Sequence, residues 1–444
     1  NINATLDWRT VASPAALDGE ATWRGQRGSV SLWVGRPSDM LRGDNSRMTL
    51  QIKSPGLSFS ANGTVAAGQR PHFQGRVVAT TDSLRETLQT LRVAVPLPVA
   101  LGRASIDATA DAGAKGVDLA DVRLKLNSSS FEGALAVRAD DERPILSGTL
   151  ATSSLDLSEL FRYASPLIGR DGHFSQEPIV WRDRDSFDLD LRLSAARAVY
   201  ERVQARDLAG AVLLRDGRLD ASLADASMYK GAVKARLVVS PSDKAGLDMK
   251  CNIEARGLDW GALGWDRFGE SHVSGLANLH LSIDGTGGSF DQIARSLNGH
   301  GDMELTKGDI AGIDVERVLR RIDKRPLATV MNIHSGRTPF ASASVSTEIA
   351  NGVATVADAT ARGDGYALAL AGTAQIAERQ MALHATVAAS DGAGEPRPDG
   401  PGFAFDIQGS WDNPSIVPDA SSFIRRSGAA RMLFAPRKTD EPAQ

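Results

Sequence analysis

The chain has 444 residues, enough for two or three ordinary domains or for one extended structure. Its 50 Lys and Arg against 54 Asp and Glu give a net charge of -4, which argues against a nucleic-acid partner. A hydrophobic content of 42% excludes disorder by composition, and no apolar run approaches the ~20 residues of a membrane helix. The single cysteine, Cys251, excludes an intrachain disulfide and a thiolate cluster.

Apolar and polar residues alternate with a period of two along most of the chain. Clear examples are Ser29–Val34, Met48–Lys53, Phe187–Leu193, Leu279–Asp284 and Phe403–Gln408. Such alternation predicts half-buried strands with one wet face. We therefore expect a mainly β fold, antiparallel by preference, of about 20 to 25 strands.

A loose unit of two strands joined by a polar elbow recurs at Gly116–Ala139, Gly217–Val239 and Gly352–Ile376. The period is irregular, so no strict solenoid is predicted. Quasi-repetition still favours an elongated sheet over a closed globule.

Four short amphipathic helices interrupt the strands. Capping residues predict their starts: Ser83 with Glu86, Asp156 with Glu159, Ser289 with Gln292, and Asp314. Prolines stop the first, second and fourth of them. We expect a flexible loop at 390–401, an amphipathic helix at 421–434 and a disordered tail after Lys438.

Catalytic patterns are weak. Ser227 and Lys230 have the Ser-x-x-Lys spacing of penicillin-binding enzymes, without their Ser-Asp-Asn and Lys-Thr-Gly partners. The glycines at 285, 287 and 288 precede a helix, but the third fingerprint glycine is replaced by Phe290. The seven histidines show no metal-ligand spacing. We expect neither enzyme activity nor a metal or cofactor.

The C-terminal third carries a more specific pattern. Ser296–Gly301 and Lys307–Val315 resemble the "sLnG-x-G... nGai-x-GiDl" signature of the AsmA family of Gram-negative envelope proteins. Thr338–Val353 and Gly409–Asp419 resemble two further blocks of that family. The resemblance is firm over about 275–420 and diffuse upstream. The residues assigned to this structural motif are Gly299, Gly301, Gly308, Gly312, Asp314, Gly352, Gly409, Trp411 and Pro414.

These motif residues specify shape and supply no nucleophile, base or metal ligand. The glycines are expected at turns or close approaches, Asp314 at a helix cap, and Pro414 where a strand ends.

The resemblance implies a periplasmic body, an inner-membrane helix before Asn1, contact with the outer membrane or its proteins near the C-terminal end, and a role in envelope lipid homeostasis. It also implies likeness to bridge-like lipid transfer proteins, in which a long curled sheet forms an open apolar groove. Three regions are expected: a β-groove at 1–270, an AsmA-like region at 271–420 and a C-terminal helix and tail at 421–444.

The leading hypothesis is a non-enzymatic conduit that binds phospholipid acyl chains. Period-two placement selects these groove candidates: Leu50, Ile52, Leu124, Leu126, Leu135, Val137, Leu189, Leu191, Leu193, Leu237, Val239, Leu279, Leu281 and Ile283. The same residues could pack a closed sandwich, because alternation does not say what covers a face. Two other hypotheses are an assembly factor for outer-membrane proteins, acting through sheet edges, and a hydrolase using Ser227 and Lys230.

Overall fold

A computed structural model describes residues 2–23, 26–93, 99–139, 143–169, 171–181, 187–243, 246–269, 271–322, 336–391 and 402–419. The 24 strands described belong to one open sheet, and six short helices accompany them. The mainly β fold is therefore confirmed, with a strand number inside the expected range. Because the strands form a single open sheet, the closed-sandwich interpretation is wrong.

The described residues fall into two compact units. Unit 1 comprises Asn1–Ser165, Ile179–Ser227 and Arg236–Asp243, and unit 2 comprises Pro166–Pro178, Met228–Ala235 and Lys244–Gln444. The predicted division at residue 270 stays a prediction.

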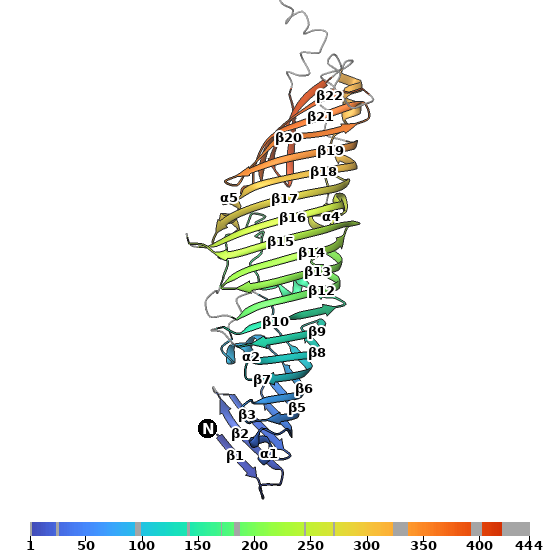
Figure 1. Cartoon of the computed structure of the whole chain (residues 1–444). Helices are drawn as coiled ribbons and strands as arrows, with labels where there is room; N and C mark the ends of the chain where they lie inside the picture. The colour runs from blue at the N-terminus through green and yellow to red at the C-terminus, as the bar shows by residue number, and fades with distance from the viewer. Residues whose placement is uncertain are drawn as a thin grey trace, which may run out of the picture. The chain divides into compact units, whose positions relative to one another are not determined.

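In unit 1, consecutive strands from β1 to β10 pair side by side as a meander, and β12 to β14 do the same (Figure 1). Its strands are β1 (Ile2–Asp7), β2 (Ala15–Trp23), β3 (Gln26–Val34), β4 (Ser46–Ser54), β5 (Leu57–Ala66), β6 (His72–Thr81), β7 (Ala104–Gly113), β8 (Gly116–Leu126), β9 (Ser129–Arg138), β10 (Ile145–Thr152), β11 (Leu155–Asp156), β12 (Asp188–Tyr200), β13 (Val203–Arg215) and β14 (Arg218–Met228). Its helices are α1 (Pro37–Arg42), α2 (Leu84–Thr90) and α3 (Leu157–Leu160).

Unit 2 continues the same pattern, again with neighbours in chain order (Figure 1). Its strands are β16 (Leu247–Asp259), β17 (Leu276–Gly287), β18 (Asn298–Ala311), β19 (Arg337–Ala350), β20 (Val353–Gly363), β21 (Tyr366–Gln375), β22 (Gln380–Ala389), β23 (Gly402–Ser410) and β24 (Asn413–Pro418). Its helices are α4 (Trp260–Phe268), α5 (Phe290–Ser296) and α6 (Val315–Ile322); β15 (Gly231–Pro241) has residues in both units.

The sheet is mixed rather than wholly antiparallel. β10 pairs with β12 in parallel, with Ile145 opposite Asp188 and Thr152 opposite Ala195. Parallel neighbours need a crossover connection of a dozen or more residues, and the long segment between β10 and β12, which includes β11 and α3, provides it. Period-two patterning cannot reveal this exception, because it is the same in both kinds of pairing.

The three sequence repeats correspond to consecutive strands: β8 with β9, β14 with β15, and β20 with β21. Their elbows contain residues with positive φ, including Asn127 at 52°, Tyr229 at 46° and Gly365 at 74°. Asn and Gly tolerate this left-handed region, which explains the polar elbow of the repeated unit.

All four predicted caps form. Ser83, Asp156 and Ser289 accept hydrogen bonds from the backbone N–H three residues on, and Asp314 accepts one from Arg317 N at 2.9 Å. The first two helices end earlier than expected, at Thr90 and Leu160. α1 and α4 were not predicted, and α4 is capped by Asp259, which accepts from Ala262 N at 3.1 Å.

The main core of unit 2 lies where α6 packs on the sheet. Val315, Val318 and Leu319 are buried against Tyr366, Leu368, Val387, Phe403 and Phe405. The buried hydroxyl of Thr338 fastens the start of α6, donating to the Ile313 carbonyl at 2.6 Å and accepting from Val315 N at 3.1 Å.

Replacing Thr338 by Val should destabilise unit 2 by about 1–3 kcal/mol, because two buried backbone groups lose their partner. Urea unfolding, with hydrogen exchange at the Val315 amide, measures this. Thr338→Ser keeps the hydroxyl and is the matched control. Equal unfolding midpoints for Thr338→Val and the wild type would contradict the assignment.

Candidate lipid-binding face

Each unit has a two-faced sheet, and one of the two faces is apolar. Residues directly opposite each other on paired strands share a face, so the register identifies its rows. In unit 1 one row crosses β3 to β9: Val30, Ile52, Phe59, Ala79, Ile106, Leu124 and Phe131. A second row crosses β8 to β14: Val117, Val137, Leu146, Leu189, Leu214 and Leu219. We call this side of the sheet the apolar face.

The parallel pairing does not interrupt the apolar face. Leu146, Gly148 and Leu150 of β10 lie opposite Leu189, Leu191 and Leu193 of β12. The register therefore keeps the apolar positions of the two strands on one side. A shift by one residue would have moved every β12 leucine to the opposite side.

Unit 2 repeats the arrangement. One row crosses β16 to β23: Ala255, Leu279, Met303, Val345, Ala359, Leu370, Ala385 and Phe405. Leu281 and Ile283 lie in the next two rows, opposite Ile253 and Cys251. The predicted candidates of each unit therefore share its apolar face, apart from Leu237 and Val239 of β15, whose partners are not described.

Most of these side chains are only partly buried. Of the fourteen candidates, Leu135 and Val239 are buried and the other twelve are intermediate. A core residue under a second layer would be fully covered, whereas these leucines keep access to solvent. All described strands belong to the one sheet, so no second sheet covers the apolar face within the described residues.

Helices close the apolar face of unit 2 at two places. α6 buries it over β20 to β23, where Ala361, Leu368, Val387 and Phe403 are nearly inaccessible. α5 packs on the end of β17, and a Cβ on Gly287 would lie 2.6 Å from Gln292 Cβ. Only glycine permits this approach.

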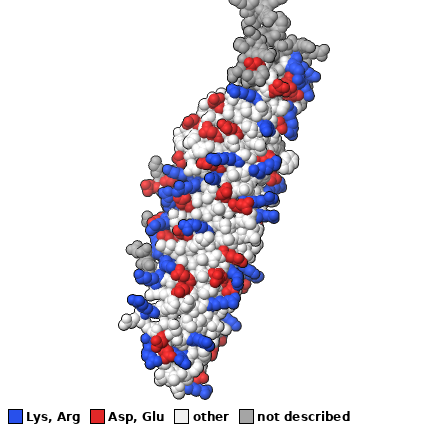
Figure 2. Space-filling view, turned by 45° about the vertical axis from the view of Figure 1, so that its right-hand side comes forward, with Lys and Arg blue, Asp and Glu red and all other residues white. Residues whose placement is uncertain are grey.

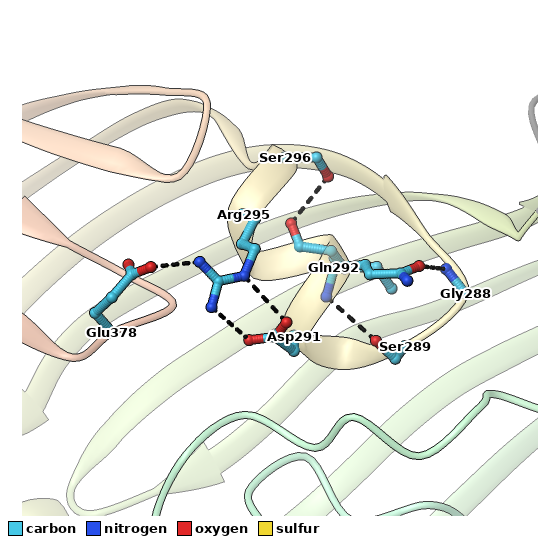
Figure 3. A network of polar contacts seen from close by, with 8 residues as sticks. Gly288, Ser289, Asp291, Gln292, Arg295, Ser296 and Glu378 are labelled. Atoms are coloured by element: carbon cyan, nitrogen blue, oxygen red, sulfur yellow. Dashed lines mark hydrogen bonds and ion pairs between the residues drawn. The ribbon is translucent and has the colours of Figure 1, made fainter.

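The attachment of α5 to the sheet end is polar (Figure 3). Gln292 accepts from Gly288 N at 2.8 Å, and Ser289 accepts from Gln292 N at 3.3 Å. Arg295 pairs with Asp291 at 3.1 Å and also reaches Glu378 in the turn between β21 and β22 (Figure 3). Gly285, Gly287 and Gly288, which match a dinucleotide-binding fingerprint only in part, lie where the chain passes from β17 into α5.

The opposite side of the sheet is charged. Arg76 pairs with Asp107 at 2.6 Å, and Arg236 with Asp220 at 2.5 Å, in each case between neighbouring strands. These arginines donate hydrogen bonds that lower the pKa of Asp107 and of Asp220. Figure 2 shows Lys and Arg mixed with Asp and Glu over the visible face. The charges keep this side in water, so the apolar face is the one available to an apolar guest.

The structure revises the roles of several motif residues. Gly299, Gly301 and Gly308 lie inside β18 rather than at turns, and Gly301 lies opposite Leu281 on the apolar face. The expected close approach is confirmed at Gly299 and Gly308, where a Cβ would clash with the backbone of the neighbouring segment. Pro414 lies in β24, the last strand, instead of ending a strand. Proline is tolerated on such an outer strand. The turn positions are Gly312 and Gly352, with φ of 97° and 76°; Gly409 is in β23 and Trp411 follows it.

The Ser-x-x-Lys pair lies at the β14–β15 elbow. Lys230 donates to Asp259 at 2.9 Å, and this hydrogen bond lowers the pKa of Asp259. Tyr229 of the same elbow donates to Asp266 of α4 at 2.9 Å. Lys230 and Tyr229 thus hold the elbow against α4. Within the described residues, no group of three or more His, Cys, Asp or Glu side chains could hold a metal ion.

Sequence reasoning missed several members of the apolar face. Val30, Phe59, Ile106 and Phe131 belong to the same row as Ile52 and Leu124. Their signal is the same alternation, visible for Val30 in Ser29–Val34. The two closing helices α5 and α6 were predicted as helices, but no pattern showed which side of the sheet they cover.

An open single-sheet β protein with one charged and one partly uncovered apolar face is the class that this geometry defines. Comparison of the sequence with known families then identifies residues 169–359 as an AsmA family domain, which confirms the resemblance. This match begins upstream of the expected 275 and ends before the block at 409–419. No curated protein and no solved structure matched the chain.

The match to the AsmA family over residues 169–359 and the open sheet fit a periplasmic lipid-transport or envelope-related role. None of the helices in the described ranges has the length and apolarity to cross a bilayer.

The Tyr229–Asp266 contact gives a pH prediction. Burial, followed by the hydrogen bond to Asp266, raises the Tyr229 pKa to about 12 from the ordinary 10.0. The folded state therefore favours the neutral phenol, and this stabilising contribution is complete below pH 10 and declines as the pH rises toward about 12.

Asp266→Asn should lower the Tyr229 pKa, because the neighbouring negative charge is lost while the burial stays. Ultraviolet titration of phenolate formation measures the pKa, and Tyr229→Phe identifies the signal by removing it. An unchanged Tyr229 titration in Asp266→Asn would show that the carboxylate has no influence on the phenol.

Proposed function

We propose that this protein is a non-enzymatic periplasmic conduit that binds phospholipid acyl chains on the apolar face and supports lipid transport between the inner and outer membranes. The proposal includes anchoring of the full-length protein in the inner membrane. The observation that carries the proposal is an apolar face that continues from strand to strand within each unit, while twelve of the fourteen candidate side chains remain only partly buried.

Burial of that face would supply the affinity. Removing apolar surface from water contributes roughly 25 cal/mol per Å², so an acyl chain lying along several rows gains free energy without specific contacts. A headgroup at the strand ends would stay in water. Because the rows offer similar apolar contacts, an acyl chain could move from one row to the next with little change in free energy.

The charged side supports the same proposal. Its cross-strand ion pairs satisfy the polar groups of that face and discourage it from packing on another apolar surface. α6 closes the apolar face over β20 to β23, so acyl chains in unit 2 would lie over β16 to β19.

Native mass spectrometry with lipid extraction tests this on the chain purified from a Gram-negative host without detergent. We expect phospholipid to co-purify with the wild type. The Leu191→Asp, Leu281→Asp variant should carry at most a tenth as much, and a tenfold loss of affinity corresponds to about 1.4 kcal/mol of binding free energy. Both leucines lie on the apolar face, one in each unit.

The matched control is Ser194→Asp with Ser282→Asp, which places the same charges on the same strands but on the opposite side. Circular dichroism establishes that both variants fold. Lipid-free wild type with a cooperative fold would overturn the proposal and favour the assembly-factor hypothesis. Equal lipid loading of the two variants would show that the apolar face is not the binding surface.

A further inference from the structure

Two adjoining pockets meet at one end of the strands in unit 1. The first, of about 330 Å³, lies between the apolar face and α2, with Val30, Ile52, Leu57 and Leu91 in its lining. The second, of about 550 Å³, includes Lys53, Arg103 and Lys125. Both are lined by Ser54, Gly56, Leu57, Thr81 and Asp82, the strand ends that separate them.

The first pocket suits an apolar chain. Val30 and Ile52 are neighbours in one row of the apolar face, and Leu91 is half-exposed at the end of α2. Its volume is within the range of pockets that bury small ligands. Its two carboxylates, Asp82 and Glu86, would repel a phosphate, so an anionic headgroup does not belong inside it.

The second pocket lies on the charged side of the same strands. The register places Lys53, Ser58, Thr80, Ser105 and Lys125 in one row across β4 to β8. Three hydroxyls thus lie between two lysines. Arg103, directly before β7, contributes a third cation to the lining. Hydroxyl and ammonium groups are hydrogen-bond donors to phosphate oxygens.

The cations of the second pocket are available to contact a phosphate. Within the described residues, the side chains of Lys53 and Lys125 make no ion pair and no hydrogen bond. Arg103 faces the single carboxylate of the pocket, Asp82, at 3.6 Å, and both side chains are largely exposed. Such an exposed pair is weak and can exchange partners. The lining therefore has three cations and one anion.

We propose that these pockets form a binding site for an anionic phospholipid, with one acyl chain between α2 and the apolar face and the phosphate on Lys53, Arg103 and Lys125. The site rests on the proposed function, because it selects among lipids that the apolar face would bind. It gives the sheet a preference for negatively charged headgroups at this end.

The test compares dihexanoyl phosphatidylglycerol with dihexanoyl phosphatidylcholine, both below their micelle concentrations, by native mass spectrometry. Single lipids remove the general attraction of lysines to an anionic membrane surface. The wild type should bind the glycerol lipid about tenfold more tightly, and Lys53→Glu with Lys125→Glu should abolish that preference. Lys115→Glu with Lys250→Glu is the matched control, since both lysines are exposed and neither lines the pockets.

The outcomes separate the two proposals. Binding of both lipids without a preference, or a preference that Lys53→Glu with Lys125→Glu retains, would overturn the headgroup site and leave the conduit standing. Absence of any lipid from the wild type would overturn both. Full displacement of the glycerol lipid by inorganic phosphate at equal concentration would overturn the site as well, because the acyl pocket would then contribute nothing.

Discussion

The structure depends on one constraint: the apolar side chains on one side of the sheet must be shielded from water. Every strand places alternate side chains on that side, and cross-strand register aligns them into rows. Water disfavours exposed apolar rows, so the chain must cover them or leave them for a guest. It covers them with α5 at the end of β17 and with α6 over β20 to β23, and twelve of the fourteen groove candidates stay only partly buried. The placement of the helices and the charge of the other side follow from this constraint, and the proposed lipid binding depends on it.

The glycines, caps and elbows serve the same constraint locally. Gly287 lets α5 approach β17 closely enough to cover the end of a row, and Ser289 with Gln292 fixes where that helix starts. Thr338 and Tyr366 do the corresponding work at α6, where the Tyr366 hydroxyl donates to the Pro339 carbonyl at 2.7 Å. The AsmA motif residues in this region are therefore structural: they shape strands, turns and one helix start.

The two sides of the sheet differ in chemistry in the same way as the two parts of a phospholipid. Apolar rows match acyl chains, whereas cationic and hydroxyl groups on the charged side match a phosphate. At the ends of β4 to β6 the two kinds of surface are separated only by a turn and neighbouring strand ends. A molecule with both chemistries can therefore contact both sides there.

The sequence by itself determined the strands, the caps of four helices and the side to which most candidate residues belong. These are local properties: alternation fixes a face, and a cap depends on residues three apart. It could not determine that Leu146 lies beside Leu189 in parallel, that Gly301 faces Leu281, or that α6 covers Phe403. Only the tertiary structure decided these, because they depend on pairing between segments distant along the chain. The openness of the sheet is of the same kind, since alternation is identical whether a face is covered or free.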